Sequence, residues 1–170
     1  MQKLDFIKKY IGFARESEAA TGMNYLVSLT QGALESAWGE SAPGNNFFGE
    51  KDSDGVNGNE QLLLTTEYSS SKSLRFPVII SIAWDSAKKL YKYRVKDYFR
   101  KYPTAKDGFI AHAYFFKNRT RYAKAWLVRN DPYAFFKEAA KAGYATTPNY
   151  SSMLTTTCKS IEKIIKDNNL

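Results

Sequence analysis

The 170-residue sequence contains a single cysteine and a single histidine, Cys158 and His112. One cysteine cannot form an internal disulfide, so we expect stability that does not depend on an oxidising compartment. Zinc sites are built mainly from cysteine and histidine, and this one pair has no motif that supports a Cys/His nucleophile. We therefore expect no metal and no cofactor. We interpret Cys158 as a small buried apolar residue and His112 as a structural residue of an apolar helix.

The sequence also has no apolar run long enough to span a bilayer. Its first ten residues alternate lysine, aspartate and apolar residues and do not form the apolar centre of a signal peptide. We therefore expect no membrane span and no leader in the sequence as given.

Acidic residues are outnumbered, 17 against 25 lysines and arginines, which gives a net charge of +8. A basic protein favours an anionic partner, which leaves nucleic acid, a membrane surface or an acidic polymer open. An ordinary soluble surface explains many of these lysines equally well. Aromatic residues make up 15% of the chain, which excludes a disordered composition and favours a packed fold.

The apolar pattern predicts helices at both ends of the chain and strands between them. The expected helices cover about 3–22, 24–38, 106–117, 132–142 and 150–166, and the expected strands cover 62–68, 74–82 and 91–102. The second strand is interrupted by Pro77, and a helical turn follows it from Trp84 to Leu90. This order predicts an α+β fold that is mainly helical.

One carboxylate, Glu35, lies within the otherwise apolar helix expected from Asn24 to Trp38. The apolar stripe of this helix consists of Leu26, Leu29, Ala33 and Ala37. Glu35 lies at the edge of the stripe, in line with Gln31 and Trp38, because residues three and four apart share a helix face. A partly dry setting raises the pKa of a carboxyl group, which would make Glu35 a general acid suited to glycoside cleavage. An ordinary ion pair on a half-exposed helix is the alternative.

With these elements placed, the sequence resembles the bacterial glucosaminidase domains of glycoside hydrolase family 73. Four stretches carry the resemblance, in the order of the family's motifs: Gln31–Gly39, Asn45–Lys51, Thr65–Tyr68 and Ala142–Tyr150. Two positions depart from the family pattern. Glu50 stands where an aliphatic residue is usual, and Thr147 stands where an aspartate is common.

The resemblance implies a lysozyme-like α lobe with a small β-hairpin lobe that flanks the cleft. We expect one catalytic domain over residues 1–170, with the β lobe at about 52–102. The resemblance places the general acid at Glu35, the second acid at Glu67 and an active-site tyrosine at Tyr144. It also implies a set of substrate-binding residues: Gln31, Trp38, Asn46, Phe48, Tyr68, Tyr122 and Tyr150.

The implied activity is hydrolysis of the β-1,4 bond after N-acetylglucosamine in peptidoglycan. Two carboxyl groups normally share such a reaction. Asp52, Asp54 and Glu60 are alternatives to Glu67, and an N-acetyl group of the substrate can itself attack the anomeric carbon. A muramidase, a lytic transglycosylase and a non-catalytic wall-binding module remain alternative functions.

The resemblance also sets the expected partners and location. We expect a monomer that acts at the bacterial cell wall on peptidoglycan glycan strands, with anionic wall polymers as further partners. No nucleic acid is expected, because no recognition motif accompanies the charge. Without a leader, the chain would be a phage-type protein released from the cytoplasm or a domain cut from a longer secreted autolysin.

Overall fold

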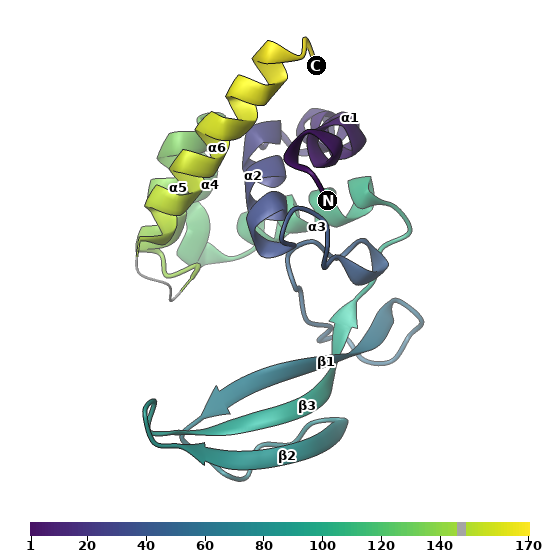
Figure 1. Cartoon of the computed structure of the whole chain (residues 1–170), viewed down its shortest axis with the longest axis vertical. Coiled ribbons are helices and arrows are strands. Elements are labelled where there is room, and N and C mark those ends of the chain that lie inside the picture. The colour runs from purple at the N-terminus through teal and green to yellow at the C-terminus, as the bar shows by residue number, and fades with distance from the viewer. Residues whose placement is uncertain (146–148) are drawn as a thin grey trace. The chain divides into compact units, whose positions relative to one another are not determined.

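The computed structural model describes residues 1–145 and 149–170 and divides into two compact units. Met1–Phe48 and Tyr102–Leu170 form a helical unit, and Gly49–Lys101 forms a unit built on an antiparallel sheet (Figure 1). The predicted α+β class with mainly helical structure is confirmed. No helix in the described part of the chain is both long enough and apolar enough to cross a membrane.

The helical unit contains the helices that the apolar pattern predicts. Their bounds are α1 Lys3–Thr21, α2 Tyr25–Glu35, α3 Ala105–Lys117, α5 Pro132–Lys141 and α6 Tyr150–Asp167. The short α4, Ala123–Leu127, was not predicted, because five residues are too few for a periodic pattern. Eight of the eleven residues of α2 are buried, and α2 packs against α1, α3, α5 and α6. It is the central helix of the unit.

Side-chain caps fix where three of these helices begin. Asn24 accepts a hydrogen bond from the Leu26 amide at the start of α2, and Asp131 caps α5 in the same way. Thr104 and Asp107 form a reciprocal capping box at the start of α3. These polar side chains satisfy N–H groups that a helix cannot pair internally, so the sequence sets the helix boundaries locally.

The predicted continuation of α2 to Trp38 is wrong, because the helix ends at Glu35. The Ser36 hydroxyl donates to the carbonyl oxygen of Gly32, so a side chain competes for the backbone acceptor at this point. Ala37 and Trp38 then adopt left-handed backbone conformations, with φ of 50° and 58°. Ala37 is exposed and does not belong to the buried stripe.

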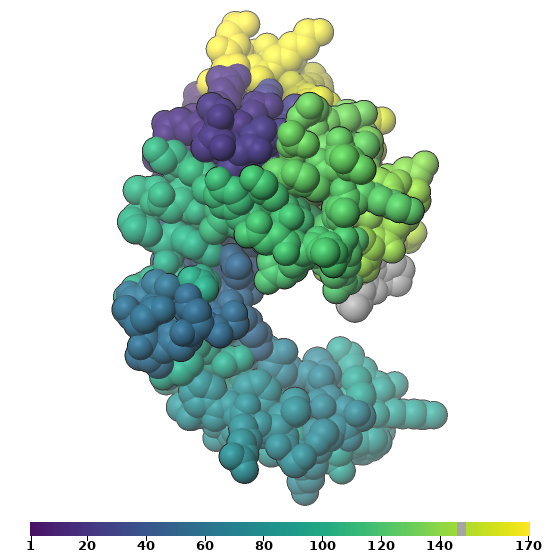
Figure 2. Space-filling view, turned by 180° about the vertical axis from the view of Figure 1, so that it is seen from behind, coloured from purple at the N-terminus to yellow at the C-terminus, as the bar shows by residue number. Residues whose placement is uncertain are grey.

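The rest of the helical core is closed by aromatic residues from outside α2. Phe47 is almost fully buried and contacts the rings of Tyr10 and Phe109, at centroid distances of 4.9 and 5.1 Å. Side chains of α1 and α3 to α5 form a continuous surface on one face of this unit (Figure 2). Cys158 is fully buried, as predicted.

The chain leaves and re-enters the helical unit at two segments that are bonded to each other. The Tyr102 amide donates to the carbonyl oxygen of Gly44 at 2.7 Å. The side-chain amide of Asn45 donates to the carbonyl oxygens of Tyr102 and Pro103, at 2.9 and 3.3 Å. The ends of the Gly49–Lys101 segment are therefore anchored to one another inside the helical unit.

The sheet consists of β1 Glu60–Ser69, β2 Val78–Asp85 and β3 Leu90–Arg100, and the three predicted strands are confirmed with shifted bounds. Their order is β1-β3-β2, with both pairs antiparallel (Figure 1). β2 begins directly after Pro77, because proline cannot donate to a ladder. The helical turn predicted from Trp84 is wrong, since Trp84 lies in β2 and pairs with Tyr91.

One face of the sheet is packed within the same unit. Tyr93 and Val95 of β3 are fully buried on this face. The segment before β2 covers them: the Tyr93 hydroxyl donates to the carbonyl oxygen of Ser71 at 2.8 Å, and the Phe76 ring lies 5.6 Å from the Tyr93 ring. Residues 71–76 therefore give this small sheet a core of its own.

Candidate active site

Glu35 is the last residue of α2, and the first residue of α6 holds it in place. The Tyr150 hydroxyl donates a hydrogen bond to Glu35 Oε1 at 2.6 Å, across 115 positions of sequence. Burial raises the pKa of the Tyr150 phenol, and the charge of the Glu35 carboxylate raises it further. Tyr150 is therefore a permanent donor to this carboxylate.

The partly dry setting predicted for Glu35 is wrong, because its side chain is exposed. The helix turns its buried side to Gln31 and Ala33, and Glu35 projects from the helix end. An exposed carboxyl group fixed by one buried phenol is open to a large substrate. The Glu35 carboxyl group is thus both accessible to a substrate and held in a defined position.

Behind Tyr150 lies a buried polar pair that joins α2 to α3. Gln31 Oε1 and His112 Nε2 are 3.0 Å apart, and both side chains are buried. An amide oxygen only accepts, so the neutral imidazole carries its proton on Nε2. Burial lowers the pKa of His112 to about 3.

The side-chain amide nitrogen of Gln31 lies on the side of the Tyr150 hydroxyl, which in turn donates to Glu35. It has no partner at full hydrogen-bond geometry among the described residues, yet it lies close enough to the Tyr150 hydroxyl to oppose the rise in that group's pKa. His112, Gln31, Tyr150 and Glu35 therefore form a polar row from the core to the surface. His112 is buried, so its structural role stays a prediction that fits its position, and its contact with Gln31 was not foreseen.

Aromatic rings surround this polar row. Phe48 stacks on His112 with a centroid distance of 3.5 Å and an interplanar angle of 1°. Tyr144 lies 6.1 Å from the His112 ring and 5.8 Å from the Tyr150 ring. Tyr122 is buried beside Tyr144, at 6.1 Å. Phe48, Tyr122 and Tyr144 come from segments far apart in the sequence and thus gather around His112 and Tyr150.

Two further residues of the helical unit lie outside this group of rings. Trp38 packs edge-on against Phe6 of α1, at 5.7 Å, with Lys3 over its indole ring. The helical register that aligned Trp38 with Glu35 does not extend that far, so the predicted alignment is wrong. Asn46 is buried at the end of the loop that precedes Phe47. Roles for both in substrate binding stay predictions.

Glu67 belongs to the sheet unit, where a lysine holds it. Lys51 Nζ lies 2.7 Å from Glu67 Oε1 and 2.7 Å from Asp97 Oδ2, and the Thr65 hydroxyl also donates to Glu67 at 3.3 Å. Partial burial acts to lower the pKa of Lys51, but its hydrogen bonds to Asp97 and Glu67 outweigh burial and raise it. Lys51 is therefore a cation that holds the side chains of Glu67 and Asp97 in place.

The remaining predicted site residues are placed as follows. Tyr68 is half-buried on the sheet, with Lys88 Nζ 3.7 Å from its ring centroid. Asp52 and Asp54, the proposed substitutes for Glu67, form ion pairs with Arg100 at 3.3 and 2.8 Å. Thr147 lies outside the described residues. Among the described residues, no cluster of three histidine, cysteine, aspartate or glutamate side chains is placed to hold a metal ion.

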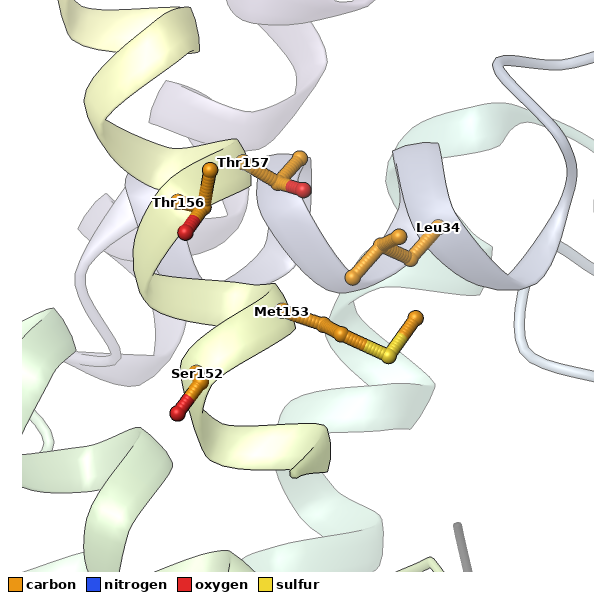
Figure 3. A pocket seen from close by; sticks show the side chains of 5 residues that line it. All are labelled: Leu34, Ser152, Met153, Thr156 and Thr157. Atoms are coloured by element: carbon orange, nitrogen blue, oxygen red, sulfur yellow. The ribbon is translucent and has the colours of Figure 1, made fainter. Parts of the chain in front are cut away.

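A shallow groove of about 350 Å³ lies between α2 and α6. Leu34 and Met153 face one another across it, with Ser152, Thr156 and Thr157 along α6 (Figure 3). None of the described residues that line this groove has a titratable side chain. We therefore place the candidate chemistry at Glu35 and not in the groove.

Comparison with known proteins decides the family. Residues 12–163 match the sequence profile of the glucosaminidase family, described as mannosyl-glycoprotein endo-beta-N-acetylglucosaminidase. The chain belongs to this glucosaminidase family. The resemblance to glycoside hydrolase family 73 is thereby confirmed, and with it the enzyme class, a glycoside hydrolase.

Curated relatives of this glucosaminidase-family chain include two named proteins. It is 27% identical over 154 residues to the peptidoglycan hydrolase FlgJ of Pseudomonas aeruginosa, covering 86% of this chain and 34% of the relative. It is 29% identical over 160 residues to an autolysin of Enterococcus faecalis, covering 88% of this chain and 19% of the relative. The glucosaminidase-family chain thus spans well under half the length of both.

Solved structures confirm the fold of the glucosaminidase-family chain. The glycoside hydrolase domain of Salmonella typhimurium FlgJ superimposes with a TM-score of 0.67 at 23% identity, covering 99% of this chain and 94% of that one. The catalytic domain of the autolysin Auto from Listeria monocytogenes gives a TM-score of 0.68 at 24% identity, covering 94% and 84%.

Proposed function

We propose that this chain is a peptidoglycan hydrolase that cleaves the β-1,4 bond after N-acetylglucosamine at the bacterial cell wall, with Glu35 as the general acid. One observation carries the proposal: the exposed Glu35 carboxyl group is fixed by the buried Tyr150 hydroxyl at 2.6 Å. The family and the relatives named as peptidoglycan hydrolases support the substrate class. We further propose that both units act as one catalytic domain.

A general acid must reach the glycosidic oxygen and hold its geometry while the proton moves. Exposure of Glu35 gives the access, and the bond from Tyr150 restricts the side chain. Tyr150 donates to only one of the two carboxyl oxygens in the structure. The other oxygen is then available to carry the proton that is delivered to the leaving group.

Glu67 is our candidate for the second role. Because Lys51 holds the Glu67 carboxyl group in place at 2.7 Å, this group is suited to activate water or to stabilise positive charge at the anomeric carbon. Attack by the acetamido group of the substrate is the competing route, in which Glu67 orients that group. Tyr144 would then contribute its hydroxyl beside Tyr150.

Digestion of purified peptidoglycan, followed by mass spectrometry of the fragments, tests this proposal. We expect reducing N-acetylglucosamine ends, no lysis by Glu35→Gln, and strongly reduced lysis by Glu67→Gln. Asp85→Asn is the matched control, because it removes a carboxylate of the same unit as Glu67 that accepts from the amides of the turn after β2 and is not a candidate acid. Full lysis by Glu35→Gln overturns the assignment of the acid, and reducing or anhydro muramic acid ends overturn the choice of bond.

A further inference from the structure

Three cations form a row on the middle strand of the sheet. Lys92, Arg94 and Lys96 alternate with the buried residues of β3, and all three are exposed. Residues two apart in a strand point to the same face, so these charges stand about 7 Å apart along one side. The row lies between β1 and β2, which flank β3 on either side (Figure 1).

The strand register identifies the neighbours of this row. β1 places Tyr68, Thr66 and Leu64 opposite the three cations, and β2 places Ala83, Ser81 and Val78 opposite them. None of these six residues is acidic. A further lysine, Lys88, lies over the Tyr68 ring at 3.7 Å and extends the positive charge beyond the end of the row. We call Lys88, Lys92, Arg94 and Lys96 the basic face.

The four acidic residues of the three strands have other partners. Glu67 and Asp97 bind Lys51 on the opposite, packed face. Glu60 accepts from the amides of Asn57 and Gly58, at 3.0 and 2.8 Å, at the beginning of β1. Asp85 accepts from the amides of the turn after β2.

Within the described part of the chain, none of the four cations of the basic face takes part in an ion pair. Mutual repulsion of like charges on adjacent positions of one strand lowers stability unless a counter-charge compensates it. Glu67 and Asp97 therefore compensate Lys51 on the packed face, whereas the positive row on the other face has no ion-pair partner among the described residues.

We propose that the basic face binds an anionic chain polymer of the cell wall, a polyol chain linked by phosphodiesters. Regularly spaced cations on a flat, open strand match a chain that repeats a single negative charge. A single-stranded nucleic acid also needs aromatic surfaces for its bases along the row of charges. The strand register places two rings on this face, Tyr68 beneath Lys88 at one end of the row and Tyr98 beyond Lys96 at the other, and the residues opposite Arg94 and Lys96 are not aromatic. The choice of a wall polymer, and not the binding of a polyanion itself, rests on the proposed function.

The test measures binding of the full chain to a purified poly(glycerol phosphate) at several salt concentrations. The triple variant Lys92→Gln, Arg94→Gln, Lys96→Gln is compared with a control triple variant, Lys117→Gln, Lys124→Gln, Lys137→Gln. The control residues are exposed cations of the helical unit, and each triple removes three positive charges from the net +8. Thermal unfolding establishes that both variants are folded.

We expect the face variant to lose at least tenfold in affinity at low salt and the control to lose less than threefold. The slope of log affinity against log salt should become shallower by roughly 2 in the face variant, since each phosphate contact on a single chain contributes about 0.7. Equal losses in both variants would show attraction by net charge alone and would overturn the proposal.

Two further probes decide the partner. Tighter binding of the basic face to a single-stranded oligonucleotide of equal charge, or to vesicles with anionic lipids, would overturn the choice of a polyol phosphate. The assay needs no bond cleavage, so it is independent of the proposed hydrolysis. Failure of lysis with retained polymer binding refutes the proposed function alone, and the reverse result refutes only this inference.

Discussion

The single histidine of the chain allows one buried group to be followed through acid denaturation. His112 is buried against the stacked Phe48 ring, and burial lowers its pKa to about 3 from an ordinary value of 6.5. The unfolded chain therefore binds a proton between these two values that the folded chain excludes. The contribution of His112 to the free energy of unfolding is therefore fully present above about pH 6.5. It decreases as the pH falls below 6.5, and the decrease ends near pH 3.

The size of the effect follows from the two pKa values. Between pH 7 and pH 5 the difference amounts to about 2 kcal/mol, since each unit of pKa is worth about 1.4 kcal/mol. Most carboxylates stay ionised in this window, so their contribution to the slope is small. A 2 kcal/mol loss is a large part of the stability of an ordinary domain, about 5–15 kcal/mol.

Denaturant unfolding at pH 7.0, 6.0 and 5.0 measures this slope. The variants His112→Gln and His112→Phe should both be less stable at pH 7, because each disturbs the bond to Gln31, yet both should show a nearly flat profile down to pH 5. An NMR titration of the only imidazole in the wild-type chain gives the second readout. A histidine that titrates near pH 6.5 in the folded protein, or variants that keep the wild-type slope, would refute the reasoning.

Two other predictions concern a pair of glycines and the tyrosine that holds Glu35. Gly12→Ala in α1 should raise the free energy of unfolding by about 0.5–1 kcal/mol, because a Cβ there meets no atom within 4 Å. Gly108→Ala in α3 should lower the free energy of unfolding by about 1–3 kcal/mol, because its Cβ would stand 2.4 Å from the carbonyl oxygen of Asn45. Thermal unfolding of the two variants measures both effects. Stabilisation by both substitutions would contradict this packing. Tyr150→Phe should lower kcat on soluble peptidoglycan fragments roughly tenfold with little change in KM, because one hydrogen bond to a charged group contributes about 1.5 kcal/mol. A raised KM with an unchanged kcat would instead identify Tyr150 as a substrate-binding residue.

Local sequence signals predicted most helices and strands, because interactions between residues close in the sequence determine where these elements begin and end. Asp131 caps α5 and Thr104 caps α3 through hydrogen bonds between residues two or three apart in the sequence. The end of α2 was missed for an equally local reason. Ser36 bonds back to the carbonyl of Gly32, and apolar periodicity alone does not register that competition.

The candidate site was less accessible to sequence reasoning. The helical pattern singled out Glu35, but it gave no sign that Tyr150 would meet it, since that contact depends on how α6 packs against α2. The same holds for His112, which was predicted to be a structural residue of an apolar helix, with no sign of the bond to Gln31. Long-range contacts between polar side chains depend on the packing of whole helices, and no single segment encodes that packing.

The hydrogen bonds that join Gly44 and Asn45 to Tyr102 bear on how the length of the sheet segment can change. The helical unit holds both ends of Gly49–Lys101, so the segment behaves thermodynamically as a closed loop. The entropy of closing such a loop grows only with the logarithm of its length, and growth from about 30 to about 50 residues adds about 0.4 kcal/mol. Adding a strand such as β2 to a two-stranded hairpin therefore costs little chain entropy. If a shorter hairpin replaced this segment, the same hydrogen bonds of Gly44 and Asn45 to Tyr102 would still join its two ends to the helical unit.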